Sequence, residues 1–314
     1  MINERKNFRR ILCPIGLTPD SDEALRYAIA LAKAYRAKLF VLHCAEVYQV
    51  ANLTEQCHIE SNLKDLINKY LRLPAAQLDT EVVVVDGDPS TVITREAAER
   101  RIDLIVMRSR RRPTAAALLG STAETICRTA PCPVLITHAQ EQEWAGITTN
   151  EIGLQRVLVA HDFSSDSELA LSYGLSLAQE YQAEFHLLHV LPPRAKSEAP
   201  EIANLPTSAE TAFDEVANRL RRALPDETYL WCQVKQAVRE GHPYREVLDY
   251  AEEQNMDLIC MGASGSGFGM HALFGSNADR VLRQAPCPIL IARPLKPMMF
   301  SAESGSVENR FQAV

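Results

Sequence analysis

The chain repeats itself, and this feature constrains its fold more than any other. Residues 10–44 and 156–190 align without a gap, as RILCPIGLTPDSDEALRYAIALAKAYRAKLFVLHC and RVLVAHDFSSDSELALSYGLSLAQEYQAEFHLLHV. Later in each copy, APCPVLIT and APCPILIA close a second matching stretch. The copies lie about 150 residues apart in a chain of 314, and this spacing is a common length for one domain. The repeat therefore predicts two domains with one architecture.

Each copy alternates short apolar runs with amphipathic stretches. The first helix of each copy is expected to begin at Asp20-Ser21 or Asp166-Ser167, because these residue types cap helices. A Gly-x-Pro turn at Gly87 and Gly241 opens a later helix, where proline suits the first turn. The runs EVVVV and YLWCQV are expected to form the third strand of each copy. Short strands alternating with helices predict a parallel sheet with helices on both faces.

The sequence thus predicts an α/β fold with two tandem, doubly wound, five-stranded parallel-sheet domains. The expected domain limits are residues 1–140 and 153–296, and residues 297–314 are expected to form a flexible tail. Residues 138–155, which read HAQEQEWAGITTNEIGLQ, have the polar composition of a linker between the domains.

Composition narrows the class of protein. The net charge of −7 and the pI near 5.7 argue against wholesale binding to nucleic acid or to anionic membranes. No run approaches the roughly 18 apolar residues of a membrane span, and the start does not resemble a secretory signal, so a cytoplasmic location is expected. The eight cysteines are then expected to be thiols, and no metal site is predicted from them.

The copies differ at a few positions that decide what each can bind. The second copy has Gly262 and Gly265 where the first has Arg108 and Arg111, and Gly275-Ser276 follows to open a helix. Ligands of open parallel sheets bind beyond the carboxyl ends of the strands, and a helix N-terminus favours a phosphate. Glycine lets the backbone approach such a ligand, whereas arginine fills the space. The second copy is therefore the candidate binding half.

The spacing Gly-x2-Gly-x9-Gly-Ser resembles the universal stress protein family. Asp162 after the first strand and the strings HDFSSDS and APCPILI fit the same family, and the resemblance spans nearly the whole chain as two tandem domains. It implies the strand order 3-2-1-4-5 in each domain. It also implies an intrachain pseudo-dimer through the fifth strands, Val134–Thr137 and Ile289–Ala292, and allows a homodimer of chains.

The resemblance further implies an adenine-nucleotide site (ATP, ADP or AMP, with Mg²⁺ as the accompanying ion) in the C-terminal domain only. Carried over to this chain, Asp162 would lie near the ribose and base, and Val190 beside the adenine. The other residues would surround the phosphates and ribose. The full set of candidate nucleotide-binding residues is Asp162, Val190, Met261, Gly262, Gly265, Gly275, Ser276 and Asn277.

Two interpretations of the glycine motif stay open. Ser276 followed by Asp279, and Ser121 followed by Glu124, have the spacing of a capping box, so Gly-Ser alone indicates only a helix start. The complete pattern favours nucleotide binding by a regulatory protein with at most slow hydrolysis, since no general base is evident; no enzyme activity is predicted. The alternative is an interaction or scaffold protein that needs no ligand.

The first copy is expected to bind no adenine nucleotide in the family manner. Gly16 stands at the position of Asp162, and Cys44 at that of Val190. The arginines at 108 and 110–112 form a basic loop, which is either solvated or paired with acids of the other half, or else an anion site in the vacated cleft. His43 and His189 repeat at the end of the second strand, so both are expected to be structural.

Overall fold

A computed structural model describes residues 6–16, 22–45, 53–71, 78–109, 120–137, 152–193, 208–264 and 275–293. Residues 138–151 of the predicted linker, the predicted tail, Gly265 and the arginines at 110–112 lie outside these ranges. The domain limits 1–140, 153–296 and 297–314 therefore stay a prediction.

The first half contains five strands and four helices within the described ranges. They are β1 (Arg10–Pro14), α1 (Asp22–Tyr35), β2 (Lys38–Ala45), α2 (Leu53–Leu71), β3 (Thr80–Asp86), α3 (Pro89–Glu99), β4 (Leu104–Arg108), α4 (Ser121–Thr129) and β5 (Val134–Thr137).

The second half repeats this order within its described ranges and adds one short helix. Its elements are β6 (Arg156–Ala160), α5 (Ser165–Tyr181), β7 (Glu184–Leu191), α6 (Ser208–Ala223), α7 (Thr228–Trp231), β8 (Val234–Glu240), α8 (Pro243–Glu253), β9 (Leu258–Gly262), α9 (Ser276–Gln284) and β10 (Ile289–Ala292).

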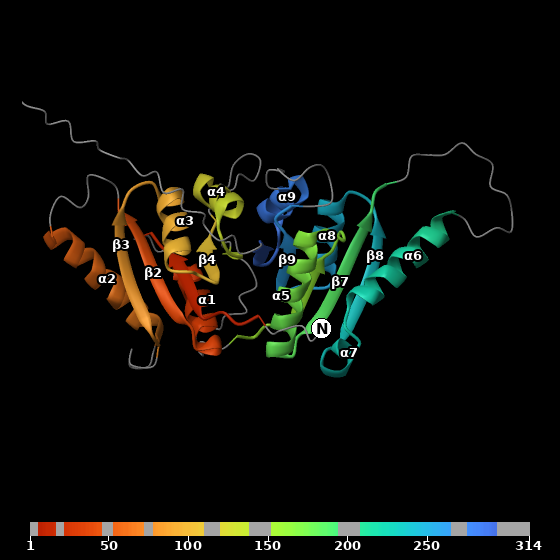
Figure 1. The fold of residues 1–314 in the computed structure, drawn as a ribbon, viewed down its shortest axis with the longest axis horizontal. Coiled ribbons are helices and arrows are strands. Elements are labelled where there is room, and N and C mark those ends of the chain that lie inside the picture. Colours follow the sequence, from red (N-terminus) through yellow and green to blue (C-terminus); the bar gives the residue numbers. More distant parts are fainter. Residues whose placement is uncertain are drawn as a thin grey trace, which may run out of the picture.

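The strands form one ten-stranded sheet in the order β3-β2-β1-β4-β5-β10-β9-β6-β7-β8 (Figure 1). Each half thus has the order 3-2-1-4-5 with parallel neighbours, which confirms the predicted fold class. One apolar core joins α1, α2, α5 and α6 to the sheet, and another joins α3, α4, α8 and α9 to it. Both cores contain residues from both halves, because the strands of the two halves form one continuous sheet.

The halves meet where β5 pairs with β10, the two strands for which the sequence predicts an intrachain contact. Ile136 lies opposite Ile289 and Val134 opposite Ile291 in an antiparallel register. The N-terminal segment adds a second contact, because the Phe8 ring stacks on Tyr173 of α5 with 5.9 Å between the ring centroids. The sheet is therefore continuous across the junction.

Two local predictions were wrong. In YLWCQV, residues 229–231 belong to α7 and β8 begins only at Val234. Leu230 is 85% exposed, so this apolar run does not enter the core, and apolar composition alone misplaced the strand. Helix α5 is capped by Ser164, whose hydroxyl accepts a hydrogen bond from the Ser167 N–H, and not by Asp166-Ser167. Asp20-Ser21 lies outside the described residues.

The cysteines are thiols, as the sequence predicts. All eight cysteines are free, and burial raises the pKa of Cys44 to about 11 and that of Cys127 to about 12. Within the described ranges, no helix has the length and apolar character to cross a bilayer.

Candidate functional site

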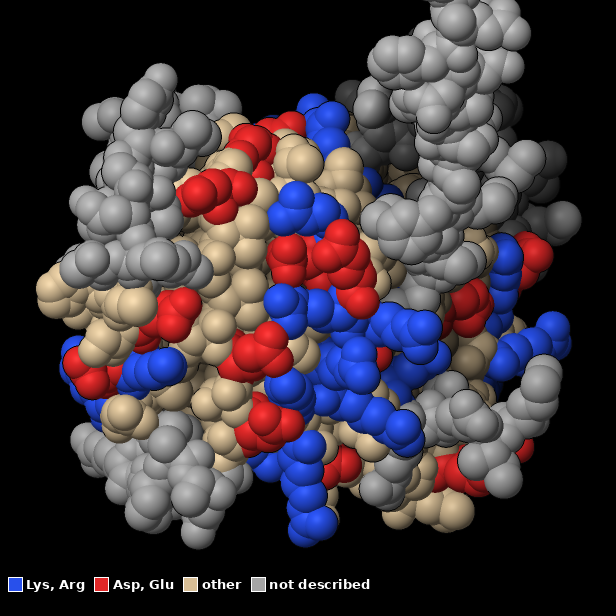
Figure 2. Space-filling view, turned by 60° about the vertical axis from the view of Figure 1, so that its left-hand side comes forward, with Lys and Arg blue, Asp and Glu red and all other residues tan. Residues whose placement is uncertain are grey.

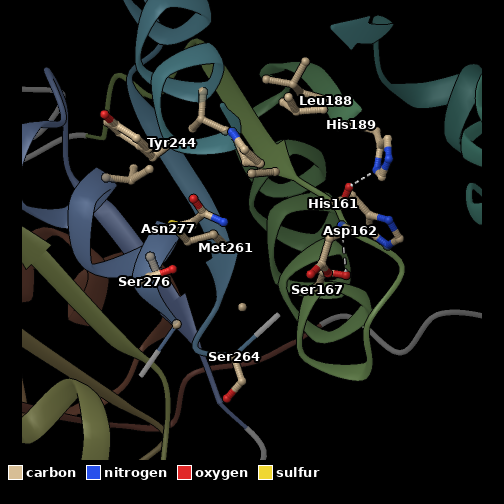
Figure 3. A pocket seen from close by; sticks show the side chains of 18 of the residues that line it. His161, Asp162, Ser167, Leu188, His189, Tyr244, Met261, Ser264, Ser276 and Asn277 are labelled. Carbon is tan, nitrogen blue, oxygen red and sulfur yellow. Dashed lines mark hydrogen bonds between the residues drawn. The ribbon is translucent and has the colours of Figure 1, made fainter. Parts of the chain in front are cut away.

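A cavity of about 480 Å³ lies in the second half, at the carboxyl ends of β6, β7 and β9 and the N-termini of α8 and α9 (Figure 3). This volume falls in the range of small-molecule sites, roughly 300–1,000 Å³. Seven of the eight predicted residues line it: Asp162, Val190, Met261, Gly262, Gly275, Ser276 and Asn277. The eighth, Gly265, lies outside the described residues. The fold therefore brings together residues that are far apart in the sequence.

Asp162 organises the turn before α5 and lines the cavity. Its Oδ1 accepts hydrogen bonds from the N–H and the hydroxyl of Ser164, at 3.1 and 2.6 Å, so it organises the turn before α5. Its side chain also lines the cavity. The turn holds the carboxylate in one orientation, which suits a group that must accept hydrogen bonds from a ligand.

Gly262 is required by packing and not only by close approach of a ligand. A Cβ at this position would lie 2.8 Å from the backbone carbon of Asp166 and 2.9 Å from the backbone nitrogen of Ser167. The next loop is tied to the same turn, because the Ser264 N–H donates to Asp166 Oδ2 at 3.1 Å. The glycine therefore lets β9 approach the first turn of α5, which closes one side of the cavity.

In the first half, Arg108 occupies the position of Gly262 and lies largely buried. Its Nε is 3.8 Å from Glu23 Oε2 at the start of α1. This acid belongs to the same half as Arg108, so this contact lies within the first half. The arginines at 110–112 lie outside the described residues, and both interpretations of that loop stay predictions.

Helix α9 presents its N-terminus to the cavity without a side-chain cap. Gly275 is the N-cap residue, and Asp279 bonds to Arg283 one turn further on instead of to the cap. The capping-box interpretation of Ser276 is therefore wrong, since a capping box needs a side chain at the N-cap position. First-turn N–H groups have no carbonyl partner within their helix and can bind an anion.

His161 and His189 also line the cavity, and their hydrogen bonds are structural. His189 Nδ1 donates to the His161 carbonyl at 2.7 Å, and His43 Nδ1 lies 3.0 Å from the Ile15 carbonyl at the matching place in the first half. Burial lowers the pKa of His161 to about 4, so this ring is neutral at pH 7. At pH 7 the His161 ring therefore adds no positive charge beside Asp162.

Sequence reasoning missed Tyr244, which follows the Gly-x-Pro turn and lines the cavity. Two arginines hold its side chain: the Arg245 Nε donates to the Tyr244 hydroxyl at 2.8 Å, and the Arg280 guanidinium lies 4.7 Å from the ring centroid. The matching residues of the first half are serine and threonines. Comparing the copies at helix starts, as well as at glycines, would have identified this tyrosine.

Within the described ranges, no group of three or more His, Cys, Asp or Glu residues has the arrangement to hold a metal ion. The polar lining of the cavity consists instead of hydroxyls, two imidazoles, one carboxylate, an amide and helix-terminal N–H groups. These donors fit a phosphate ester better than a bare cation.

Comparisons with known proteins agree with this architecture. Residues 7–138 and, again, residues 153–293 match the universal stress protein family. The chain belongs to this family. Both halves are thus universal stress domains, including the half whose glycine motif is altered.

Some relatives match most of the chain, and others match less than half of it. A universal stress protein of Mycobacterium tuberculosis is 27% identical over 90% of this chain and 96% of its own length. Universal stress protein G of Escherichia coli is 34% identical, over 40% of this chain and 89% of its own. A crystal structure of a universal stress protein from Archaeoglobus fulgidus has the same fold, with a TM-score of 0.64 at 24% identity, and the match covers 90% of this chain and 98% of that one.

Proposed function

We propose that the second half of this universal stress protein binds an adenine nucleotide (ATP, ADP or AMP) and that the bound nucleotide regulates the protein. The observation that carries the proposal is the 480 Å³ cavity at the carboxyl edge of the sheet, where seven motif residues converge. Open α/β sheets bind their ligands in this place, where the strand order reverses. Regulation, and not catalysis, is proposed as the outcome of binding.

Each part of the nucleotide has suitable groups in the cavity. Apolar side chains such as Val190 and Met261 offer surfaces for the adenine, and the fixed carboxylate of Asp162 offers acceptors for ribose hydroxyls. The N-terminus of α9, with Ser276 and Asn277, offers donors for phosphate oxygens. These residues would bind and orient the ligand, and an accompanying Mg²⁺ would neutralise phosphate charge.

Charge at the site favours modest affinity. The described cavity lining contains no Lys or Arg, and charge-assisted hydrogen bonds are about twice as strong as neutral ones. Arg245 and Arg280 lie behind this lining and contact the side chain of Tyr244. We therefore expect a site that responds to changes in nucleotide concentration instead of remaining saturated.

The experiment that tests the proposal is a calorimetric titration of the purified chain with ATP, ADP and AMP, with and without Mg²⁺. Extraction of the native protein under denaturing conditions would also identify any nucleotide that co-purifies. We expect one site per chain. An absence of binding for all three nucleotides would reject the proposal and favour the ligand-independent scaffold function.

A pair of exchanges assigns the site to one half. Gly265→Arg introduces the residue that the first half has at this position and is expected to abolish binding. Arg111→Gly, the reverse exchange in the first half, should leave binding unchanged. The reverse pattern would move the site to the first half. A cytoplasmic location and a homodimer of chains belong to the same proposal and are tested by fractionation and by light scattering.

A further inference from the structure

A basic surface lies at the amino-terminal edge of the first half, where its strands begin. Its position follows from the sheet register, which places Arg10 beside Lys38. Figure 2 shows Lys and Arg side chains gathered across the middle and lower part of this side of the molecule. We define the basic edge by six residues: Arg9, Arg10, Arg36, Lys38, Arg100 and Arg101.

The second half does not share this charge, although its backbone is the same. The six matching positions carry one cation and one anion. They are Gln155, Arg156, Gln182, Glu184, Gln254 and Asn255. The fold itself therefore does not require arginine here, and the basic edge is a property of the first half alone.

Three of the arginines have side chains that are exposed and make no ion pair with any described residue: Arg9, Arg36 and Arg101. The other cations are engaged, since Lys38 and Arg100 both contact Glu81, at 2.8 Å and 2.5 Å. The Lys38 ammonium and the Arg100 guanidinium hold the pKa of Glu81 below its usual range. The basic edge thus combines a neutralised centre with exposed arginines around it.

Two of the exposed arginines also occupy unfavourable backbone positions. Arg36 and Arg101 follow helices α1 and α3 with φ of 52°, in the left-handed region where glycine or asparagine is usual. At the two matching positions, the second half has Gln182 with φ of 53° and Asn255 with φ of 49°. The left-handed backbone therefore belongs to both halves, and the arginine side chains at these positions belong to the first half alone.

We propose that the basic edge is an interaction surface for an acidic segment of a protein partner. Arginine pairs with carboxylates through two parallel hydrogen bonds, so exposed arginines around a neutral centre suit carboxylates that are spaced apart. The carboxylates of Glu81 and Asp103 lie within the edge and interrupt its positive charge, so anionic groups that are spaced apart fit it better than a continuous row. This surface does not involve the nucleotide cavity.

Neither nucleic acid nor membrane fits the surroundings as well. Among the described residues, the exposed large apolar side chains are Tyr229 and Leu230, and both lie on α7 in the other half. The basic edge therefore lacks the stacking rings of a single-strand binder and the apolar anchors of a membrane surface. The whole chain is also acidic, with a net charge of −7.

The test uses residues that the chain already contains at the matching positions. Arg36→Gln with Arg101→Asn removes two cations from the basic edge. Arg221→Gln with Arg222→Gln removes two exposed cations from α6 and serves as the control of equal charge. Binding of a fluorescein-labelled peptide with a glutamate at every third position is measured by anisotropy at low ionic strength, with the full chain.

We expect the edge variant to raise the dissociation constant at least about fivefold, and the control to change it less than twofold. Melting temperature and nucleotide binding should stay as in the parent chain, which separates this result from the proposed nucleotide site. Equal weakening by both variants, or no peptide binding by the parent chain, would overturn the proposal. Tighter binding of oligo(U) RNA or of phosphatidylserine vesicles than of the peptide would overturn the choice of partner.

Discussion

The two halves form the same sheet from the same strand order, yet they differ at both edges of that sheet. At the carboxyl edge, the second half has a cavity that Asp162 and Gly262 line, and the first half has Gly16 and Arg108 at the matching positions. At the amino edge, the first half carries the extra arginines. The comparison separates features that both halves share, which the fold needs, from features that one half has alone, which are the candidates for binding.

Two local structures, a histidine hydrogen bond and a helix that starts at glycine, occur in both halves and therefore belong to the fold. The histidine at the end of β2 or β7 bonds to the carbonyl beyond the neighbouring strand in both halves, through His43 and His189. Helices α4 and α9 both start at an uncapped glycine, Gly120 or Gly275. A feature that both halves share therefore does not by itself indicate a ligand site. A difference between the halves is better evidence for one.

Among the substitutions that exchange residues between the halves, Gly262→Arg is expected to have the largest effect on nucleotide affinity and stability. It introduces the arginine that the first half has at this position. The new side chain would collide with the first turn of α5, where an added Cβ already lies 2.8 Å from Asp166. We expect nucleotide affinity to fall more than about 100-fold and the free energy of unfolding to fall by about 3 kcal/mol. Urea denaturation and calorimetry measure the two effects.

A control for substitution of a glycine is Gly120→Ala at the start of α4, where an added Cβ meets no atom within 4 Å. Its free energy of unfolding should change by less than about 1 kcal/mol. If Gly262→Arg were as well tolerated as the control, the packing role assigned to Gly262 would be wrong.

Acid is expected to destabilise the second half more than the first. Burial lowers the pKa of His161 from 6.5 to about 4 in the folded state, and the matching residue of the first half is Ile15. The unfolded chain binds the proton more readily, so stability is lost as the pH falls from about 6.5 towards 4. The loss from this group between pH 7 and pH 5 is about 2 kcal/mol.

Urea denaturation at the two pH values measures this loss, and His161→Ile provides the comparison. The variant should lose less stability on acidification than the parent chain, whatever its stability at pH 7. Burial also lowers the pKa of His186 and His189, so part of the acid sensitivity should remain. Identical losses in parent and variant would contradict the assignment to His161.

A smaller effect is expected from Tyr244→Ser, which again introduces the residue of the first half. Loss of an aromatic wall should weaken binding of ATP and AMP about tenfold, because contact between a base and an aromatic ring contributes roughly 1–3 kcal/mol. Tyr244→Phe keeps the ring and should retain most of the affinity. If the serine variant bound nucleotide as the parent does, Tyr244 would be only a structural neighbour of Arg245 and Arg280.

The smallest effect is expected from Ser276→Ala. One neutral hydrogen bond to a phosphate contributes about 0.5–1.5 kcal/mol, so affinity should fall about threefold. Stability should not change measurably, because the N-cap of α9 is Gly275. Ser121→Ala is the equivalent change in the first half, and a titration should show no effect on nucleotide affinity. A loss of stability in the Ser276 variant would restore the capping interpretation.

Sequence patterns predicted most of the fold because the apolar runs and helix starts occur twice. The strand order came with the family resemblance, and pairing through β5 and β10 places Val134–Thr137 beside Ile289–Ala292. The errors were local. An apolar composition at residues 229–231 resembled a strand, although a short exposed helix forms there. Short segments are decided by what they contact, which a pattern does not contain.

The sequence by itself determined two doubly wound domains, the half with the glycine motif and seven of the residues that line one cavity. Only the tertiary structure decided three features of the site. A side chain at position 262 would collide with α5, Asp279 does not cap α9, and Tyr244 lines the cavity. The physical reason is that periodicity and spacing reflect burial and backbone geometry along one segment. Contacts between segments depend on how close the packed elements come, and that distance is set by the whole fold.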